Sequence, residues 1–120
     1  MKGFFREGSP IIGLEINENK IDLLLDTGFN GHIMLSQRLI DKIRLEQIGV
    51  SDYITASGEE RETRIFRTKM NFLGEEIEVP VLSTEGDFSL AGMELFNNCR
   101  ILIEKSNDIL ELTKIRVSLD

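Results

Sequence analysis

The residues best suited to chemistry follow a short apolar run, 23–25, and are Asp26, Thr27 and Gly28. An apolar strand here delivers a carboxylate into a tight turn, and glycine suits a backbone that bends sharply or lets a ligand approach closely. A carboxylate at the mouth of such a strand is only partly solvated, so its ionisation is sensitive to neighbouring groups. Because the triplet is also common turn chemistry, alone it predicts either a structural turn or a reactive acid.

Other side chains offer little competing chemistry. The sequence holds one histidine, His32, which we expect to face solvent, and one cysteine, Cys99, which we expect to be a small buried hydrophobe. There is no Cys/His cluster of the kind that binds zinc, so neither a metal nor a cofactor is expected. Asp22 shares a strand with Asp26, but four extended residues span roughly 13 Å, too far for the two to share a proton.

Size and composition predict one soluble domain, residues 1–120. The chain has 120 residues, 41% of them apolar and 29% charged, which is ordinary for a globular protein. A net charge of −7 with scattered basic residues argues against nucleic acid as a partner. No apolar run is long enough to span a bilayer or to form a secretion signal, so we expect no membrane partner and a cytoplasmic location.

Most of the chain is predicted to form β-strands. Apolar segments flank polar or glycine-containing turns in four predicted hairpins, which are 11–16 with 21–25, 54–55 with 63–66, 69–73 with 76–82, and 101–103 with 109–112. One helix is predicted, with Ser36 as its N-cap and Gly49 as its stop. Repeated hairpins with one main helix predict an all-β fold, closed or nearly closed into a barrel.

A second apolar segment late in the chain, Leu90-Ala91-Gly92, ends 66 positions after Asp26. The hairpin, the Asp-Thr-Gly turn, a later hairpin and this segment follow the order of retropepsin-like aspartic peptidases. Over about residues 10–113 the chain resembles the prokaryotic single-domain type of that family. The resemblance implies a closed retropepsin-like (acid protease) barrel. It also implies an aspartic endopeptidase that hydrolyses peptide bonds with an Asp-activated water.

Because the chain has one Asp-Thr-Gly triplet, the resemblance implies a homodimer with one Asp26 from each subunit and a peptide or protein as substrate. The hairpin at 56–58 would be a flap that closes over the substrate. The implied site residues are catalytic Asp26, Thr27 and Gly28; substrate-binding Gly28, Asn30, Ala56, Ser57 and Gly58; and Leu90, Ala91 and Gly92, which support the site from beneath.

Some positions depart from the family pattern. Phe29 follows the triplet where the family usually has a small residue, and Asn30 stands where viral enzymes have an aspartate that grips substrate backbone. The expected flap tip holds a single glycine, Gly58, rather than several. These departures leave an alternative function open, in which the same fold serves as a non-catalytic module for dimerisation or peptide binding.

Overall fold

The computed structural model describes residues 1–54 and 56–115. Thr55, in the second predicted hairpin, and the last five residues of the predicted domain lie outside the described residues. Most of the described chain forms strands, in the order β1 (Phe4–Arg6), β2 (Ser9–Ile16), β3 (Asn19–Asp26), β4 (Ile33–Ser36), β5 (Glu46–Ile54), β6 (Glu60–Phe72), β7 (Glu75–Thr84), β8 (Leu90–Gly92), β9 (Cys99–Glu104) and β10 (Ile109–Lys114). The helical elements are α1 (Gln37–Ile43) and the short 3₁₀ helices η1 (Met93–Phe96) and η2 (Lys105–Asn107).

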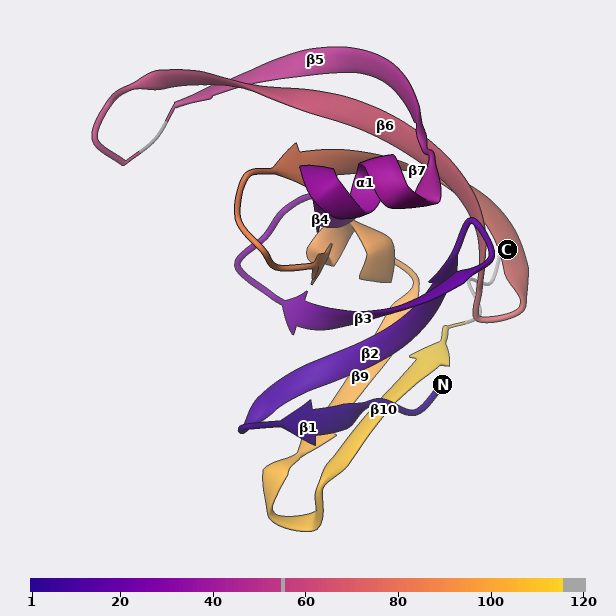
Figure 1. Cartoon of the computed structure of the whole chain (residues 1–120). Coiled ribbons are helices and arrows are strands. Elements are labelled where there is room, and N and C mark those ends of the chain that lie inside the picture. Colours follow the sequence, from indigo (N-terminus) through magenta and orange to yellow (C-terminus); the bar gives the residue numbers. More distant parts are fainter. Residues whose placement is uncertain (55, 116–120) are drawn as a thin grey trace, which may run out of the picture.

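The all-β class is confirmed, but the sheet is open. Eight strands pair in the order β1-β2-β3-β8-β4-β7-β6-β5, and β10 and β9 form a separate two-stranded sheet. Closing the large sheet would require β1 to pair with β5, and within the described residues these two strands are its edges. The β5–β6 hairpin instead projects from the body as a long arm (Figure 1). The predicted closure of the barrel is therefore not formed by hydrogen-bonded strands.

Hairpins were the best-predicted feature, because their turn signals are local. The β2–β3 turn places Asn17 and Glu18 at φ of 48° and 67°, and the β6–β7 turn places Leu73 and Gly74 at 52° and 83°. Two consecutive residues with positive φ give a turn whose twist matches the flanking strands. The β9–β10 hairpin also forms where predicted, around η2.

The helix begins where the sequence indicated but ends earlier. Ser36 is the N-cap, and its hydroxyl oxygen accepts a hydrogen bond from the backbone N–H of Leu39 at 3.2 Å. The helix stops at Ile43 because Arg44 adopts the left-handed conformation, with φ of 60°. Gly49, predicted as the stop, lies instead within β5, beside a break in its register with β6.

The core lies between the buried faces of the strands, along which buried and exposed side chains alternate. On β6, Phe66, Thr68, Met70 and Phe72 are buried while the residues between them are exposed, which is the period-2 pattern of a half-buried strand. Phe72 also packs against Phe96 of η1, with ring centroids 6.2 Å apart. No helix among the described residues is long and apolar enough to cross a membrane.

Candidate active site

The candidate catalytic loop starts at the last residue of β3, Asp26. Its side chain is half-buried, whereas Thr27 and Gly28 are exposed. The backbone N–H of Gly28 donates to Asp26 Oδ1 at 2.9 Å, and the N–H of Phe29 donates to the Asp26 carbonyl at 3.2 Å. A carboxylate oxygen that accepts a backbone N–H is held in one orientation. The turn thus holds one carboxylate oxygen and leaves Oδ2 without a hydrogen bond from the described residues.

The late apolar segment lies directly beside this loop as β8. It pairs in parallel with β3, so that Leu24 is opposite Leu90, Leu25 opposite Ala91 and Asp26 opposite Gly92. On its other side β8 pairs antiparallel with β4, the strand that follows the loop. Residues 66 positions apart in sequence are therefore neighbours, and β8 fills the space between the two strands that enter and leave the loop.

Three backbone hydrogen bonds tie the last residue of β8 and the start of η1 to the loop. The N–H of Gly92 donates to the His32 carbonyl at 2.8 Å, that of Met93 to the Phe29 carbonyl at 2.8 Å, and that of Glu94 to the Gly31 carbonyl at 3.1 Å. Backbone groups of a loop can pair with protein groups or with water, and these three loop carbonyls have protein partners. The loop that carries Asp26 is consequently held along most of its length.

Two glycines make room for the unusual Phe29. A Cβ on Gly92 would lie 2.3 Å from the Gly31 carbonyl oxygen and 2.6 Å from Cδ2 of Phe29, and a Cβ on Gly31 would lie 2.5 Å from Cζ of Phe29. The half-buried ring of Phe29 therefore occupies space that the two glycines leave open. Gly31 was not predicted as a site residue, because a glycine after Asn30 carries no local signal of what packs against it.

The candidate flap is the β5–β6 hairpin, and its arms are longer than predicted. Ala56, Ser57 and Gly58 lie near its tip and are exposed, and Gly58 has φ of 84°, a conformation that favours glycine. The charged residues 60–62, which lie between the predicted strands 54–55 and 63–66, belong to β6. Here β5 pairs only with β6, and most of the described side chains near the tip of the arm are exposed.

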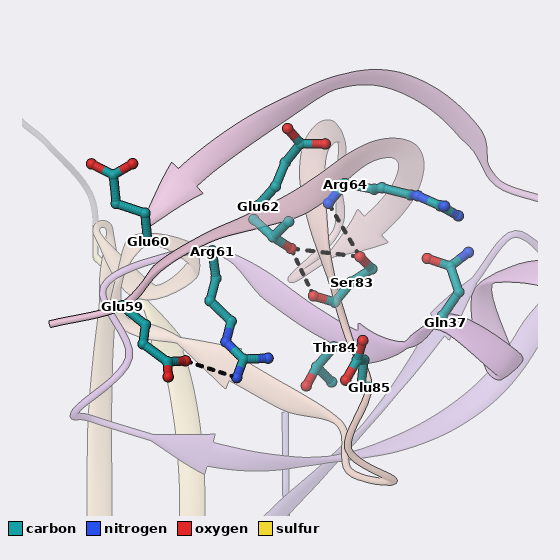
Figure 2. A pocket seen from close by; sticks show the side chains of 10 residues that line it. Gln37, Glu59, Glu60, Arg61, Glu62, Arg64, Ser83, Thr84 and Glu85 are labelled. Carbon is teal, nitrogen blue, oxygen red and sulfur yellow. Dashed lines mark hydrogen bonds and ion pairs between the residues drawn. The ribbon is translucent and has the colours of Figure 1, made fainter. Parts of the chain in front are cut away.

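A polar cavity of about 720 Å³ lies along the β6 side of this arm (Figure 2). Thr63 of β6 donates to the Ser83 carbonyl of β7 at 2.7 Å, and Arg61 pairs with Glu59 at 3.1 Å. The cavity is lined by Gln37, Glu59, Glu60, Arg61, Glu62, Thr63, Arg64, Ser83, Thr84 and Glu85. It separates the arm from the end of β7 without involving Asp26.

The remaining predicted residues are more dispersed. Asn30 is exposed on the loop, and Asp22, on the same strand as Asp26, forms an ion pair with Arg6 at 2.8 Å. His32 is half-buried, not fully solvent-facing as expected, and lines a cavity of about 270 Å³ with Cys99. Burial raises the pKa of the Cys99 thiol, and the positive N-terminus offsets part of that rise. Among the described residues, no three His, Cys, Asp or Glu side chains gather as metal ligands would.

Known proteins match this chain through their structures. No protein-family model and no curated protein matches its sequence. A retropepsin-like aspartic protease from Rickettsia conorii is 25% identical with a TM-score of 0.68, over 92% of this chain and 86% of its own. EIAV protease, in complex with the inhibitor HBY-793, is 18% identical with a TM-score of 0.63, over 75% of this chain and 86% of its own. Simian Foamy Virus (mac) protease is 18% identical with a TM-score of 0.53, over 68% of this chain and 86% of its own.

Proposed function

From the premise that this chain has the retropepsin-like fold of aspartic proteases, we propose that it is an aspartic endopeptidase active as a homodimer. Each copy contributes one Asp26, and the substrate is an extended segment of a peptide or protein. The observation that carries the proposal is the position of Asp26. It lies at the end of β3 in a loop that β8 holds from the side, with its partner residues Thr27 and Gly28 exposed.

The chemistry requires two such carboxylates. Two like charges about 3 Å apart cannot both ionise, so the pair holds a single proton and titrates as one unit. The ionised member removes a proton from a water held between them, and the water oxygen attacks the carbonyl carbon of the scissile peptide bond. The protonated member donates to the carbonyl oxygen. Collapse of the tetrahedral intermediate then breaks the C–N bond. The leaving nitrogen takes up the proton that the first carboxylate removed from the water, and the second carboxylate regains its own proton from the hydroxyl of the intermediate.

The geometry within one copy suits one half of this arrangement. The Gly28 N–H holds Oδ1 of Asp26, and Oδ2 has no hydrogen bond from the described residues, so it is available to a water. The described chain supplies no second carboxylate of this kind, since Asp22 is engaged with Arg6. A closed two-fold pair would place an identical loop opposite, where Thr27 of each copy can hydrogen-bond to the other loop.

Substrate would lie between the two loops and the two flaps. Gly28 and Asn30 are exposed on the loop, and Ala56, Ser57 and Gly58 are exposed near the flap tip, so all five can reach a bound main chain. Closure of the flap would exclude water and strengthen the electrostatic interactions at the dyad. The open, projecting arm in one copy is consistent with a flap that needs a substrate to close upon (Figure 1).

The direct test is Asp26→Asn, assayed with an unstructured protein such as casein and a library of peptides. We expect cleavage to be abolished while circular dichroism and the oligomeric state stay as in the wild type. Asp22→Asn is the matched control, because it makes the same change on the same strand and removes only an exposed ion pair. Equal cleavage by Asp26→Asn and wild type would reject the catalytic role. A wild type that binds these peptides without cleaving them would favour the non-catalytic module.

A further inference from the structure

The described structure has three strand edges that no other strand covers, and they differ in how well they are protected. β1 is only three residues long, and β5 is interrupted by an irregular register between Gln47 and Gly49. Short strands and bulges are two of the ways in which proteins prevent unwanted pairing at an edge. The outer edge of β9, by contrast, is six residues long and regular, and carries neither proline nor lysine.

The opposite edge of the same small sheet is covered. The N-terminal residues add to β10, where Gly3 N–H donates to the Leu110 carbonyl at 2.8 Å and Leu112 N–H donates to the Met1 carbonyl at 2.8 Å. The N-terminal ammonium also donates to the Leu112 carbonyl at 2.9 Å. The N-terminal residues therefore cover only the β10 edge of this sheet, and no described strand covers the β9 edge. β9 also carries two large exposed apolar side chains, Leu102 at 43% and Ile103 at 41% exposure.

The backbone of β9 presents hydrogen-bonding groups at this edge. Ile115 N–H donates to the Asn98 carbonyl, so residues 98 and 115 form a hydrogen-bonded pair in the β9–β10 ladder. Hydrogen-bonded and non-hydrogen-bonded pairs alternate in antiparallel ladders, so residues 100, 102 and 104 direct their backbone groups toward β10. Cys99, Ile101 and Ile103 consequently direct their N–H and C=O groups outward.

The side chains of β9 form a self-complementary pattern about Leu102. Arg100 and Glu104 stand two positions before and after it, and Ile101 and Ile103 one position before and after. Within the described residues Arg100 has no ion pair, and Glu104 uses Oε1 to accept a hydrogen bond from Asn107. An antiparallel copy of the strand, centred on Leu102, would place every Arg100 beside a Glu104 and every Ile101 beside an Ile103.

We propose that β9 pairs antiparallel with β9 of a second copy of this chain, with Leu102 on the two-fold axis. Two-fold symmetry requires that if residue i contacts residue j, then j contacts i, and this register satisfies the rule. Ile101 and Ile103 are the outward-bonding residues, so they form two hydrogen-bonded pairs with four backbone hydrogen bonds across the axis. The inference rests on the proposed function, since the second copy is the one that completes the catalytic dyad.

Other registers fit less well. A shift by one residue would pair Ile101 with Leu102. The free backbone groups of Ile101 would then face those of Leu102, which already bond to β10, and the paired side chains would lie on opposite faces of the sheet. A shift by two, centred on Ile101, keeps the hydrogen bonds but sets Arg100 opposite Leu102 and loses both charge pairs. Only the register centred on Leu102 satisfies the backbone, the apolar residues and the charges together. It also places the exposed side chain of Ile103 against Ile101 of the second copy, a residue that packs on the core of its own chain.

The test uses charge reversal in two separate chains. Arg100→Glu sets two Glu–Glu pairs across the axis, and Glu104→Arg sets two Arg–Arg pairs. We expect each variant to raise the dimer dissociation constant by about 10- to 100-fold, measured by analytical ultracentrifugation. A mixture of the two variants contains only opposite-charge pairs in the heterodimer, so it should dimerise as tightly as the wild type. Arg38→Glu, at an exposed position of α1, is the matched control and should leave the dissociation constant unchanged.

A chain carrying both reversals separates the interface from a folding defect. Residues 100 and 104 are about 13 Å apart along one extended strand, so they do not pair within a chain, and rescue by the double change has to act between chains. Dimerisation of the doubly reversed chain at wild-type strength supports the proposal. A wild type that is monomeric at all concentrations overturns it, as do single variants that dimerise normally.

Cleavage by the same samples distinguishes this proposal from the proposed function. If both hold, each single variant loses activity at low concentration and their mixture regains it. If the mixture forms heterodimers but neither it nor the wild type cleaves any substrate, the interface stands and the peptidase proposal fails. If the single variants stay dimeric and active, the peptidase proposal stands and the β9 interface is wrong.

Discussion

Replacing Gly92 by alanine tests whether β8 supports the candidate catalytic loop. The φ of Gly92 is −102°, a conformation open to alanine, so the change introduces no backbone strain. The added methyl would nevertheless lie 2.3 Å from the Gly31 carbonyl oxygen and 2.7 Å from the Phe29 carbonyl oxygen, both of them backbone atoms. The loop and β8 therefore have to separate.

The expected loss of stability follows from three contributions. Overpacking a closely packed site costs about 1–3 kcal/mol. Weakening one of the loop hydrogen bonds, such as that from Gly92 N–H to the His32 carbonyl, adds about 1 kcal/mol. Alanine restricts the unfolded chain, which offsets about 0.4–1 kcal/mol. We expect a net destabilisation of about 2–3 kcal/mol, or a fall in Tm of about 8–12 °C for a chain of this size.

Urea unfolding, followed by circular dichroism at one fixed protein concentration, measures this change. Gly49→Ala is the control, because no atom lies within 4 Å of a Cβ built there, and we expect it to be neutral or stabilising by less than about 1 kcal/mol. A displacement of the loop by about 1 Å should also lower peptide cleavage by about 100-fold. If Gly92→Ala unfolds at the same urea concentration as Gly49→Ala, the support that we assign to β8 is refuted.

Two further changes probe the helix cap and the thiol. Ser36→Ala should lower the free energy of unfolding by about 1 kcal/mol, because it removes the acceptor for the Leu39 N–H. Ser106→Ala, at an exposed position, should leave the free energy of unfolding unchanged. Equal urea midpoints for the two variants would contradict the role of Ser36 as the cap. Cys99 should react with iodoacetamide at pH 8 more slowly than free glutathione, because its raised pKa leaves less thiolate. Mass spectrometry measures the rate of modification. A rate faster than that of glutathione would show that burial does not control the reactivity of Cys99.

Local signals predicted the hairpins and the start of the helix. The turns at Asn17 and Gly74 and the cap at Ser36 depend on residues close in sequence, so propensity and spacing sufficed. The end of the helix was missed because Arg44, not a glycine, adopts the left-handed conformation. Residues of this kind rarely do so, and the sequence of the segment gives no other sign of it.

Long-range features were not available from local patterns. The resemblance to retropepsin-like proteins, confirmed by the structural matches, suggested that residues 90–92 lie near Asp26, but the parallel register of β3 with β8 is visible only in the structure. The prediction of a closed barrel was wrong, because the number of strands does not determine whether the two edge strands of a sheet pair with each other. Phe29 looked like a departure from the family pattern, and its accommodation by Gly31 and Gly92 depends on a contact between distant segments.

The place of β8 between β3 and β4 also bears on the order in which the chain folds. The hairpins form from neighbouring residues, but β8 reaches its place only after a loop of 66 residues closes, with an entropy cost of about 4 kcal/mol. On the ribosome, Asp26 emerges well before Gly92, and a nascent chain has the acid without the strand that braces it. The geometry around Asp26 is thus assembled only after residue 92 has been synthesised.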